Sequence, residues 1–283
     1  MRKRIKQGLT YGLLALLAVL VCLPLVWVLT GSVKSSVELS NSLAPILLEN
    51  GREVRFTLWP CFPTLRHFME VLFQSPSFFV VFWNSVRIAV LTLGGQLLVA
   101  VPAAWAFARF PSRKNSFLFT LYTVLMMMPF QVTMLSNYLV LDGLGLIGRQ
   151  AAVILPAVFS TFPVFLIYRG FTEIPEGLVE AARIDGAGDW QIFFRIGLPL
   201  GSSGILSAMV LSFLETWNLI EQPLAFLEDK ALWPLSLYLP EVGLGQAGTA
   251  FAASVITLIP AVLVFVMGQD YLEKGIVAAA MKE

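Results

Sequence analysis

The sequence predicts an all-α polytopic membrane protein with six transmembrane helices, because of its composition, the spacing of its charges and their distribution. Of the 283 residues, 57% are hydrophobic and 13% are charged, whereas soluble globular domains carry about 25% charged residues. A formal net charge of +1 leaves no basic excess of the kind that binds nucleic acid. The composition therefore excludes an ordinary soluble fold, and we expect a lipid bilayer, not nucleic acid, as the chain's surroundings.

Long gaps between charged residues indicate where the chain crosses the bilayer. A spanning helix needs about 20 mainly apolar residues, because hydrocarbon offers no hydrogen-bond partner to backbone N–H and C=O groups. The first candidate follows a basic N-terminus as a signal peptide does, but its apolar run exceeds the length of about 7–15 residues usual in such signals. We therefore expect one domain, residues 1–283, with an uncleaved first span. The six spans are expected near residues 9–30, 84–108, 116–140, 150–168, 196–216 and 249–269.

The distribution of lysine and arginine predicts which side each connection faces. Basic residues concentrate in cytoplasmic connections, and with the N-terminus inside, twelve of them are cytoplasmic and six are external. Both termini are then cytoplasmic. Residues 32–77 form an external loop, and residues 170–195 form a cytoplasmic loop between the fourth and fifth spans. Cys22 falls in the first span and Cys61 in the external loop, so we expect no disulfide between them.

The residue inventory argues against an enzyme embedded in the membrane. Catalysis there needs a nucleophile with a base, or a set of metal ligands, at membrane depth. The single histidine, His67, is external without an obvious partner, and the carboxylates fall in loops except Glu215, which ends the fifth apolar stretch. The sequence has no G-x-x-x-x-G-K-[ST] loop that would bind phosphate, so we expect no cofactor and no metal in this chain. A secondary transporter would need paired buried charges or broken helices near the midplane, and no such charge pair is present.

The cytoplasmic loop has the pattern of a short helix, a turn and a second short helix. Pro175 suits the first turn of a helix, and Glu176 lies near its positive end. Gly186 and Gly188 end that helix, and Asp189 is expected to cap the next one. A helix of about ten residues is marginal in water, so it must pack on something. A partner protein and the membrane surface both remain open from the pattern alone.

The same loop contains one specific spacing. It reads Glu180-Ala181-Ala182, then Gly186 after three residues, then Ile196 and Leu198-Pro199, which matches E-A-A-x3-G-x9-I-x-L-P in full. This motif resembles the EAA loop of binding-protein-dependent ABC importer permeases. Further segments across nearly the whole chain resemble the MalG-type subfamily, which imports oligosaccharides and related solutes. They are Asn84-Ser85, Ala103-Ala104-Trp105-Ala106-Phe107-Ala108-Arg109, Met127-Met128-Pro129, Trp217-Asn218, Lys274-Gly275 and Ala278-Ala279-Ala280-Met281-Lys282.

The resemblance implies a non-catalytic subunit of a heteromeric importer in a bacterial-type cytoplasmic membrane. Its implied partners are a second homologous permease, two cytosolic ATPase subunits that bind ATP and Mg, and an extracytoplasmic solute-binding protein. The loop helix would dock in a groove of an ATPase, with the C-terminal tail around residues 274–282 near it. The residues assigned to this contact are Glu180, Ala181, Ala182, Asp185 and Gly186.

The solute pathway is expected among polar residues of the spans, because polar groups in a helical bundle are costly and face its interior. The candidates are Gln131, Thr133, Asn137, Glu215, Trp217 and Asn218. Glu215 and Asn218 could instead lie in water at the outer surface, and Trp217 could belong to the interfacial belt. The resemblance favours a sugar or oligosaccharide as solute. A polyol or glycerol phosphate, or a secondary transporter that works without ATPases, is the alternative.

Overall fold

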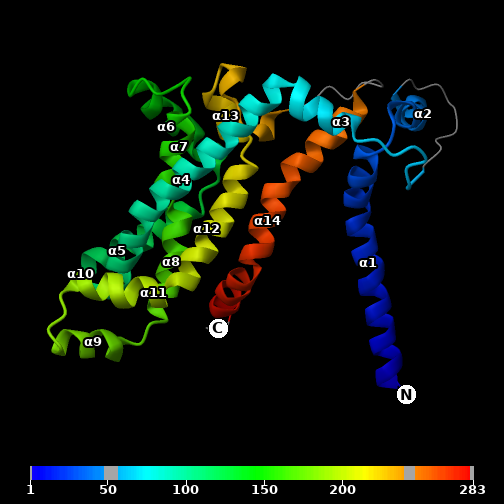
Figure 1. Cartoon of the computed structure of the whole chain (residues 1–283). Helices are drawn as coiled ribbons and strands as arrows, with labels where there is room; N and C mark the ends of the chain where they lie inside the picture. Colours follow the sequence, from blue (N-terminus) through cyan, green and yellow to red (C-terminus); the bar gives the residue numbers. More distant parts are fainter. Residues whose placement is uncertain (1, 48–56, 239–245, 281–283) are drawn as a thin grey trace. The chain divides into compact units, whose positions relative to one another are not determined.

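The computed structural model describes residues 2–47, 57–238 and 246–280. It is 81% helical, and no strand occurs within these ranges. The chain divides into two compact units, one of residues 1–79 with 239–260 and the other of residues 80–238 with 261–283. Two long helices, α4 (Pro76–Arg109) and α14 (Ala247–Ala280), contribute to both units (Figure 1).

The first unit contains α1 (Arg2–Ser32), α2 (Ser36–Leu47), α3 (Arg66–Met69), the π-helix η1 (Glu70–Gln74) and the first half of α14. The rings of Trp27 and Phe251 meet edge to face, with 5.7 Å between their centroids. A Cβ atom on Gly31 would lie 3.2 Å from the Phe251 ring. The end of α1 and the start of α14 therefore approach closely at this glycine.

His67 is a buried packing residue, so the expectation that it lacks a partner is wrong. Its Nε2 atom lies 3.2 Å from the Lys34 carbonyl oxygen, and its Nδ1 atom lies 3.5 Å from a Glu70 carboxylate oxygen. The ring fills the place that a Cβ on Gly248 would take. Burial by itself raises the pKa of Glu70, but hydrogen bonds from Thr249 and Arg66 and the nearby His67 ring outweigh it and leave this pKa below its ordinary value.

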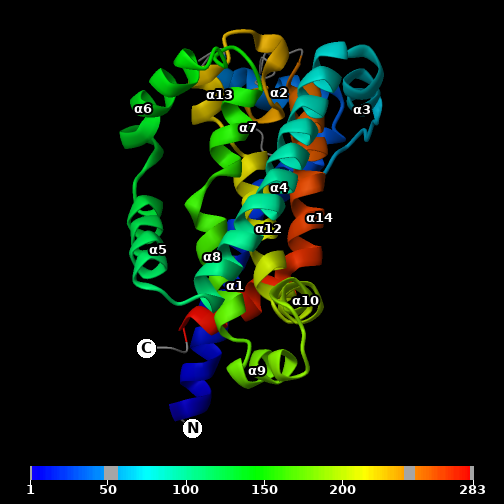
Figure 2. The same ribbon diagram turned by 90° about the vertical axis from the view of Figure 1, so that its left-hand side faces the viewer.

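The second unit is a bundle built from the remaining helices. They are α5 (Arg113–Met126), α6 (Phe130–Gly143), α7 (Ala151–Val158), α8 (Thr161–Thr172), α9 (Glu176–Ile184), α10 (Asp189–Ile192), the π-helix η2 (Phe193–Gly197), α11 (Leu198–Leu200), α12 (Ser202–Trp217) and α13 (Glu221–Phe226), with short 3₁₀ turns η3 (Lys230–Leu232) and η4 (Leu235–Leu237). Within this unit, α9 lies at the end opposite α13 (Figures 1 and 2).

Four helical segments are long and apolar enough to cross a membrane, namely Thr10–Ser32, Pro76–Arg109, Ala151–Thr172 and Ala247–Glu273. Two bent helix pairs raise the number to six if each counts as one span. One pair joins α5 to α6 at 108°, and the other joins the 189–200 segment to α12 at 67°. The prediction of an all-helical, multi-pass membrane protein is therefore confirmed.

The structure has no single continuous helix over the expected spans 116–140 and 196–216. The first breaks between α5 and α6, because Pro129 has extended backbone angles (φ −68°, ψ 150°), supplies no N–H and disfavours a helical residue before it. Figure 2 shows α5 and α6 as separate helices. The second breaks at Gly201, three residues from the start of α11, and α12 continues in a new direction.

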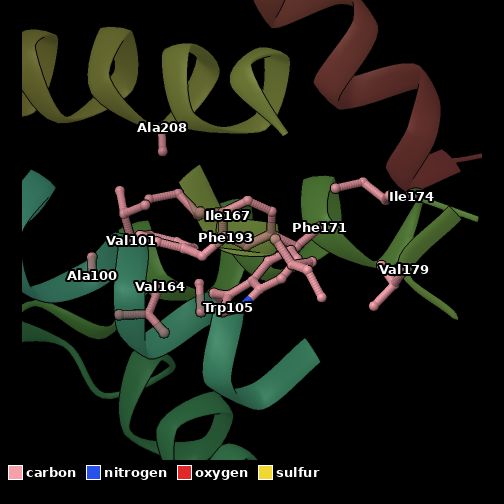
Figure 3. Packing of buried hydrophobic residues seen from close by; sticks show 12 residues of the cluster. Ala100, Val101, Trp105, Val164, Ile167, Phe171, Ile174, Val179, Phe193 and Ala208 are labelled. Carbon is pink, nitrogen blue, oxygen red and sulfur yellow. The ribbon is translucent and has the colours of Figure 1, made fainter. Parts of the chain in front are cut away.

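A glycine pair lets α8 and α12 cross at close range. A Cβ atom on Gly204 would lie 2.9 Å from the Cα atom of Gly170, and a Cβ on Gly170 would lie equally close to Gly204. Small residues of this kind allow backbones to approach in membrane bundles. The main core lies beside this crossing and contains Trp105, Ile167 and Phe193 (Figure 3).

Candidate functional site

The helix α9 is divided into an inward face and an outward face. Val179 is 3% exposed and packs into the main core (Figure 3). Ala182 is partly buried against the same cluster. On the other face, Ile184 is 86% exposed, and the small exposed residue Ala181 lies three positions before it. Residues three and four apart share a helix face. One face of α9 is therefore packed on the main core, and the opposite face is exposed.

Gly186 ends α9 with a backbone φ of +81°. The Ala187 N–H donates to the Ala182 carbonyl at 2.9 Å, and the Gly186 N–H donates to the Arg183 carbonyl at 3.0 Å. These two bonds form a Schellman cap, whose left-handed position glycine occupies without steric cost. A Cβ here would meet no atom within 4 Å, so the need for glycine comes from the backbone conformation and not from space.

Of the five residues assigned to the coupling contact, four are exposed and one faces inward. The exposed residues are Glu180, Ala181, Asp185 and Gly186, whereas Ala182 is half-buried against the core. The expected role of Asp189 as a cap is wrong, because Gly188 occupies the cap position and its N–H donates to the Gln191 side chain. Asp189 instead pairs with Arg183 at 3.4 Å on the surface.

Arg109 joins the end of α4 to the segment that leads into α9. Its guanidinium donates to the carbonyl oxygens of Phe171 (2.9 Å) and Ile174 (2.7 Å), which satisfies acceptors at the end of α8. The same group lies over the Trp105 ring, 5.4 Å from its centroid. The sequence motif that resembles the permease subfamily includes Arg109, but the sequence alone predicted no contact for this residue. An arginine at the end of an apolar stretch, four residues after a tryptophan, was the available signal.

Trp105 connects this anchor to the second half of the loop. Its ring lies edge-on to Phe171, with 5.1 Å between centroids, and within 5.7 Å of the Phe193 centroid. A Cβ on Gly197 would lie 2.7 Å from Trp105. The loop 170–195 is therefore held at both ends by one packed cluster, which joins α9 to the ends of α4 and α8.

A polar cavity of about 620 Å³ lies in the second unit, beside the break between α5 and α6. The Gln96 amide donates to the Ala157 carbonyl at 2.8 Å. Its Oε1 atom is buried without a hydrogen-bond partner, as is that of Gln222. The lining residues are Gln96, Leu125, Met126, Met128, Phe130, Thr133, Asn137, Pro156, Ala157, Phe159, Ser160, Thr161, Phe162, Glu215, Thr216, Leu219 and Gln222.

The structure brings three of the six pathway candidates to this cavity, Thr133, Asn137 and Glu215. Gln131 donates to a Glu221 carboxylate oxygen at 2.7 Å, at a separate and smaller cavity. Trp217 is 4% exposed and stacks on Phe213. The Asn218 amide donates back to the Leu214 carbonyl of its own helix at 2.8 Å. Trp217 is therefore not available to stack on a solute in this structure.

Sequence reasoning missed Gln96 and Gln222, although both carry an unpartnered buried acceptor. Gln96 follows a glycine pair inside an apolar stretch, and a polar amide at such a position was the signal that could have found it. The Asn84-Ser85 motif has a structural role. Asn84 donates to the carbonyls of Ala231 and Trp233, and the Ser85 hydroxyl accepts from the Leu235 N–H.

Comparison with known proteins identifies the family. The model of the binding-protein-dependent transport system inner membrane component matches residues 96–278. The chain belongs to this family. It is therefore a membrane-embedded, non-catalytic permease subunit of an ABC importer, and membership implies a partner ATPase and a solute-binding protein. The alternative of a secondary transporter without ATPases is set aside for this reason.

Similar proteins cover nearly the whole chain. The arabinooligosaccharides transport system permease protein AraQ of Halalkalibacterium halodurans is 30% identical over 97% of this chain and 95% of its own length. The lactose transport system permease protein LacG of Rhizobium radiobacter is 27% identical over 99% of this chain and 98% of its own. A bacterial ABC transporter that imports the acidic polysaccharide alginate has the same fold, with a TM-score of 0.80 over 96% of this chain and 98% of its own, at 21% identity.

Proposed function

We propose that this permease subunit conducts a neutral sugar or oligosaccharide and couples to a cytosolic ATPase through α9. The observation that carries the solute class is the lining of the polar cavity. Among the described residues around it, Glu215 is the only ionisable one. Phosphate and carboxylate groups are usually bound by arginine or lysine, so a glycerol phosphate or an acidic sugar would lack its counter-charge here.

The cavity has the hydrogen-bonding groups that a neutral sugar needs. Gln96 and Gln222 line the cavity, and each holds an amide oxygen without a protein partner. A rotation of either side chain would turn this oxygen to the cavity, where it can accept from a hydroxyl group. Thr133 and Asn137 add groups that donate and accept. Aromatic rings of Phe130 and others form part of the wall. The names of AraQ and LacG, which refer to arabinooligosaccharides and lactose, support the same solute class.

The coupling proposal follows from the anchoring of α9. Moving a two-state transporter from 1:99 to 99:1 takes about 5.5 kcal/mol of differential binding, and the sequence has no nucleotide-binding loop of its own. We infer that this free energy enters through the outward face of α9, where Glu180, Ala181 and Asp185 contact an ATPase. Ala182 does not take part in this contact, because its small side chain faces inward and lets α9 pack closely on the core.

The complete assembly is proposed as this chain, a second homologous permease, two ATPases that bind ATP and Mg, and a solute-binding protein. Six spans cross the membrane, if the two bent pairs each count as one, and both termini face the cytoplasm. The external loop is 32–77 and the coupling loop 170–195. The C-terminal tail is expected near the ATPase. Its residues 281–283 lie outside the described residues, so a contact between this tail and the ATPase stays a sequence-based proposal.

Uptake by the reconstituted transporter tests the solute class. We expect neutral disaccharides and oligosaccharides to be taken up or to compete, and glycerol phosphate and alginate oligosaccharides to do neither. Glu215→Gln should change the KM for the neutral solute several-fold, because the carboxyl group lines the cavity, while the level of assembled complex stays the same. Uptake of the anionic solutes alone would contradict the neutral class.

Thiol labelling tests the orientation. Cys61 is exposed, and its N–H donates to the carboxylate of Glu38 in α2. We expect a membrane-impermeant maleimide to label it from outside intact cells, whereas Cys22 stays protected by lipid. Asn41→Cys, at an exposed position of α2, provides a second reporter on the same side. Labelling of both reporters only after permeabilisation, in cells that lack the solute-binding protein, would reverse the proposed orientation.

A further inference from the structure

The first unit carries an exposed apolar surface outside the candidate spans, which we call the aromatic patch. Trp59, Phe62 and Phe73 are each 74% exposed, Leu65 is 67% exposed and Met69 is 54% exposed. Met69 and Phe73, four residues apart, share one face of the helix formed by α3 and η1, and Leu65 directly precedes this helix at the same spacing. Trp59 and Phe62 precede this helix by a few residues. Exposed apolar groups gathered in this way mark a contact surface.

The opposite face of the same helix is firmly held. Val71 is 1% exposed, as is His67, which lies against Gly248 at the start of α14. Thr249 donates to the Glu70 carboxylate at 3.1 Å, so α3 and η1 are fixed to the first turns of α14 (Figure 1). The patch therefore belongs to a fixed helix and keeps its outward direction.

The charges of this segment are paired with one another. Between residues 57 and 75 the charged side chains are Arg66 and Glu70, and the one histidine is His67. Arg66 and Glu70 are 2.9 Å apart, and Glu70 also lies beside the His67 ring. The patch itself thus combines aromatic and aliphatic side chains with one long arginine at its edge, a side chain whose head can extend toward water.

Chain connectivity places the patch close to the first residues of a candidate spanning helix. The helix ends at Gln74, and the candidate span of α4 begins at Pro76, so Phe73 is three residues from a span. At about 3.8 Å per residue, that distance is at most about 11 Å. Phe79, in the first turn of α4, is also an exposed aromatic residue. The span in α1, in the same unit, has none of its window buried within the structure.

We propose that the aromatic patch rests in the interfacial layer of the leaflet in which α1 ends and α4 begins. Tryptophan and other aromatic side chains favour this layer, between headgroups and acyl chains, and a helix fixed by its other face can lie in the membrane plane there. The partner is the lipid surface, not the solute-binding protein or the second permease. This contact is independent of the solute and of the coupling loop.

Spin-label accessibility tests the proposal in the complete transporter reconstituted in liposomes. Met69→Cys, in a background with Cys22→Ser and Cys61→Ser, puts the label at the centre of the patch. We expect its ratio of oxygen to nickel-chelate collisions to exceed several-fold that of a label at Asn41→Cys, the aqueous standard. It should lie below the ratio of a label at native Cys22 in a Cys61→Ser background, the standard for the bilayer interior. Solute uptake by each labelled variant confirms that the protein is folded.

Two outcomes would overturn the lipid contact. A ratio at Met69 equal to that at Asn41 would mean that the patch faces water. Protection of the Met69 label from both oxygen and the nickel chelate would mean that protein covers it. Neither result would alter the proposed solute class or coupling site, which are measured by uptake and by ATPase association.

Discussion

Gly186→Val is expected to abolish transport while the subunit remains inserted in the membrane. Gly186 has φ of +81° and closes the Schellman cap of α9. A residue with a Cβ pays about 1–2 kcal/mol in this left-handed conformation, and a β-branched side chain is the least suited to it. The chain would relieve this strain by changing φ, which breaks the cap and turns α9 away from its direction. A short helix that docks by few contacts cannot absorb such a change.

A neighbouring glycine provides the matched control. Gly188 has extended backbone angles (φ −72°, ψ 160°), and a Cβ there would also meet no atom within 4 Å. Gly188→Val adds the same side chain to the same loop without the left-handed backbone cost and loses only the preference for glycine over valine at the α10 cap, so its transport should stay far closer to the wild-type rate than that of Gly186→Val. The measurements are membrane level, co-purification of the ATPase and solute uptake. Wild-type uptake by Gly186→Val at matched levels would remove the 170–195 loop from the coupling role.

Hydropathy predicted helices in the membrane but could not predict their breaks. The reason is that a proline in an apolar stretch can either lie within a continuous helix or end it. Pro24, Pro102 and Pro260 lie inside continuous helices, whereas Pro129 separates α5 from α6. Neighbouring helices decide whether the lost backbone bond is satisfied within a straight helix. That depends on tertiary packing, which a single sequence does not display.

The coupling loop could be predicted in more detail than the solute cavity, for a physical reason. A cap such as that at Gly186 is a local property, so residue type and spacing predict it. Cavity lining depends on the direction of each side chain in the folded bundle. Glu215 and Trp217 are two residues apart on α12, yet Glu215 lines the cavity and Trp217 is buried beside Phe213. Polarity and position made both residues candidates for the solute pathway. Only the packing of the bundle shows which of the two side chains faces the cavity.

Substitutions at the crossing of α8 and α12 are expected to reduce transport almost as strongly as Gly186→Val. These helices flank the coupling loop, α8 on its N-terminal side and α12 beyond α11. Their backbones meet at Gly170 and Gly204, where an added Cβ would lie 2.9 Å from a backbone atom of the other helix. A flexible side chain could move aside, but a backbone atom in a helix cannot. Any larger residue must therefore separate the two helices or tilt them.

Gly204→Leu is expected to reduce transport more than tenfold and to lower the Tm of the purified complex, with Gly204→Ala intermediate. Overpacking of a core costs about 1–3 kcal/mol, and here it falls on the joint between the coupling loop and the cavity wall. Gly94→Leu is the control, because Gly94 lies in the α4 span with no atom within 4 Å of its added Cβ. The double variant Gly170→Ala with Gly204→Ala should lower the Tm by less than the sum of the two single variants, since the first change has already separated the helices.

Two outcomes would contradict this prediction. Additive losses of Tm, or normal transport by Gly204→Leu at matched membrane levels, would show that this contact is not required for the helices to act together.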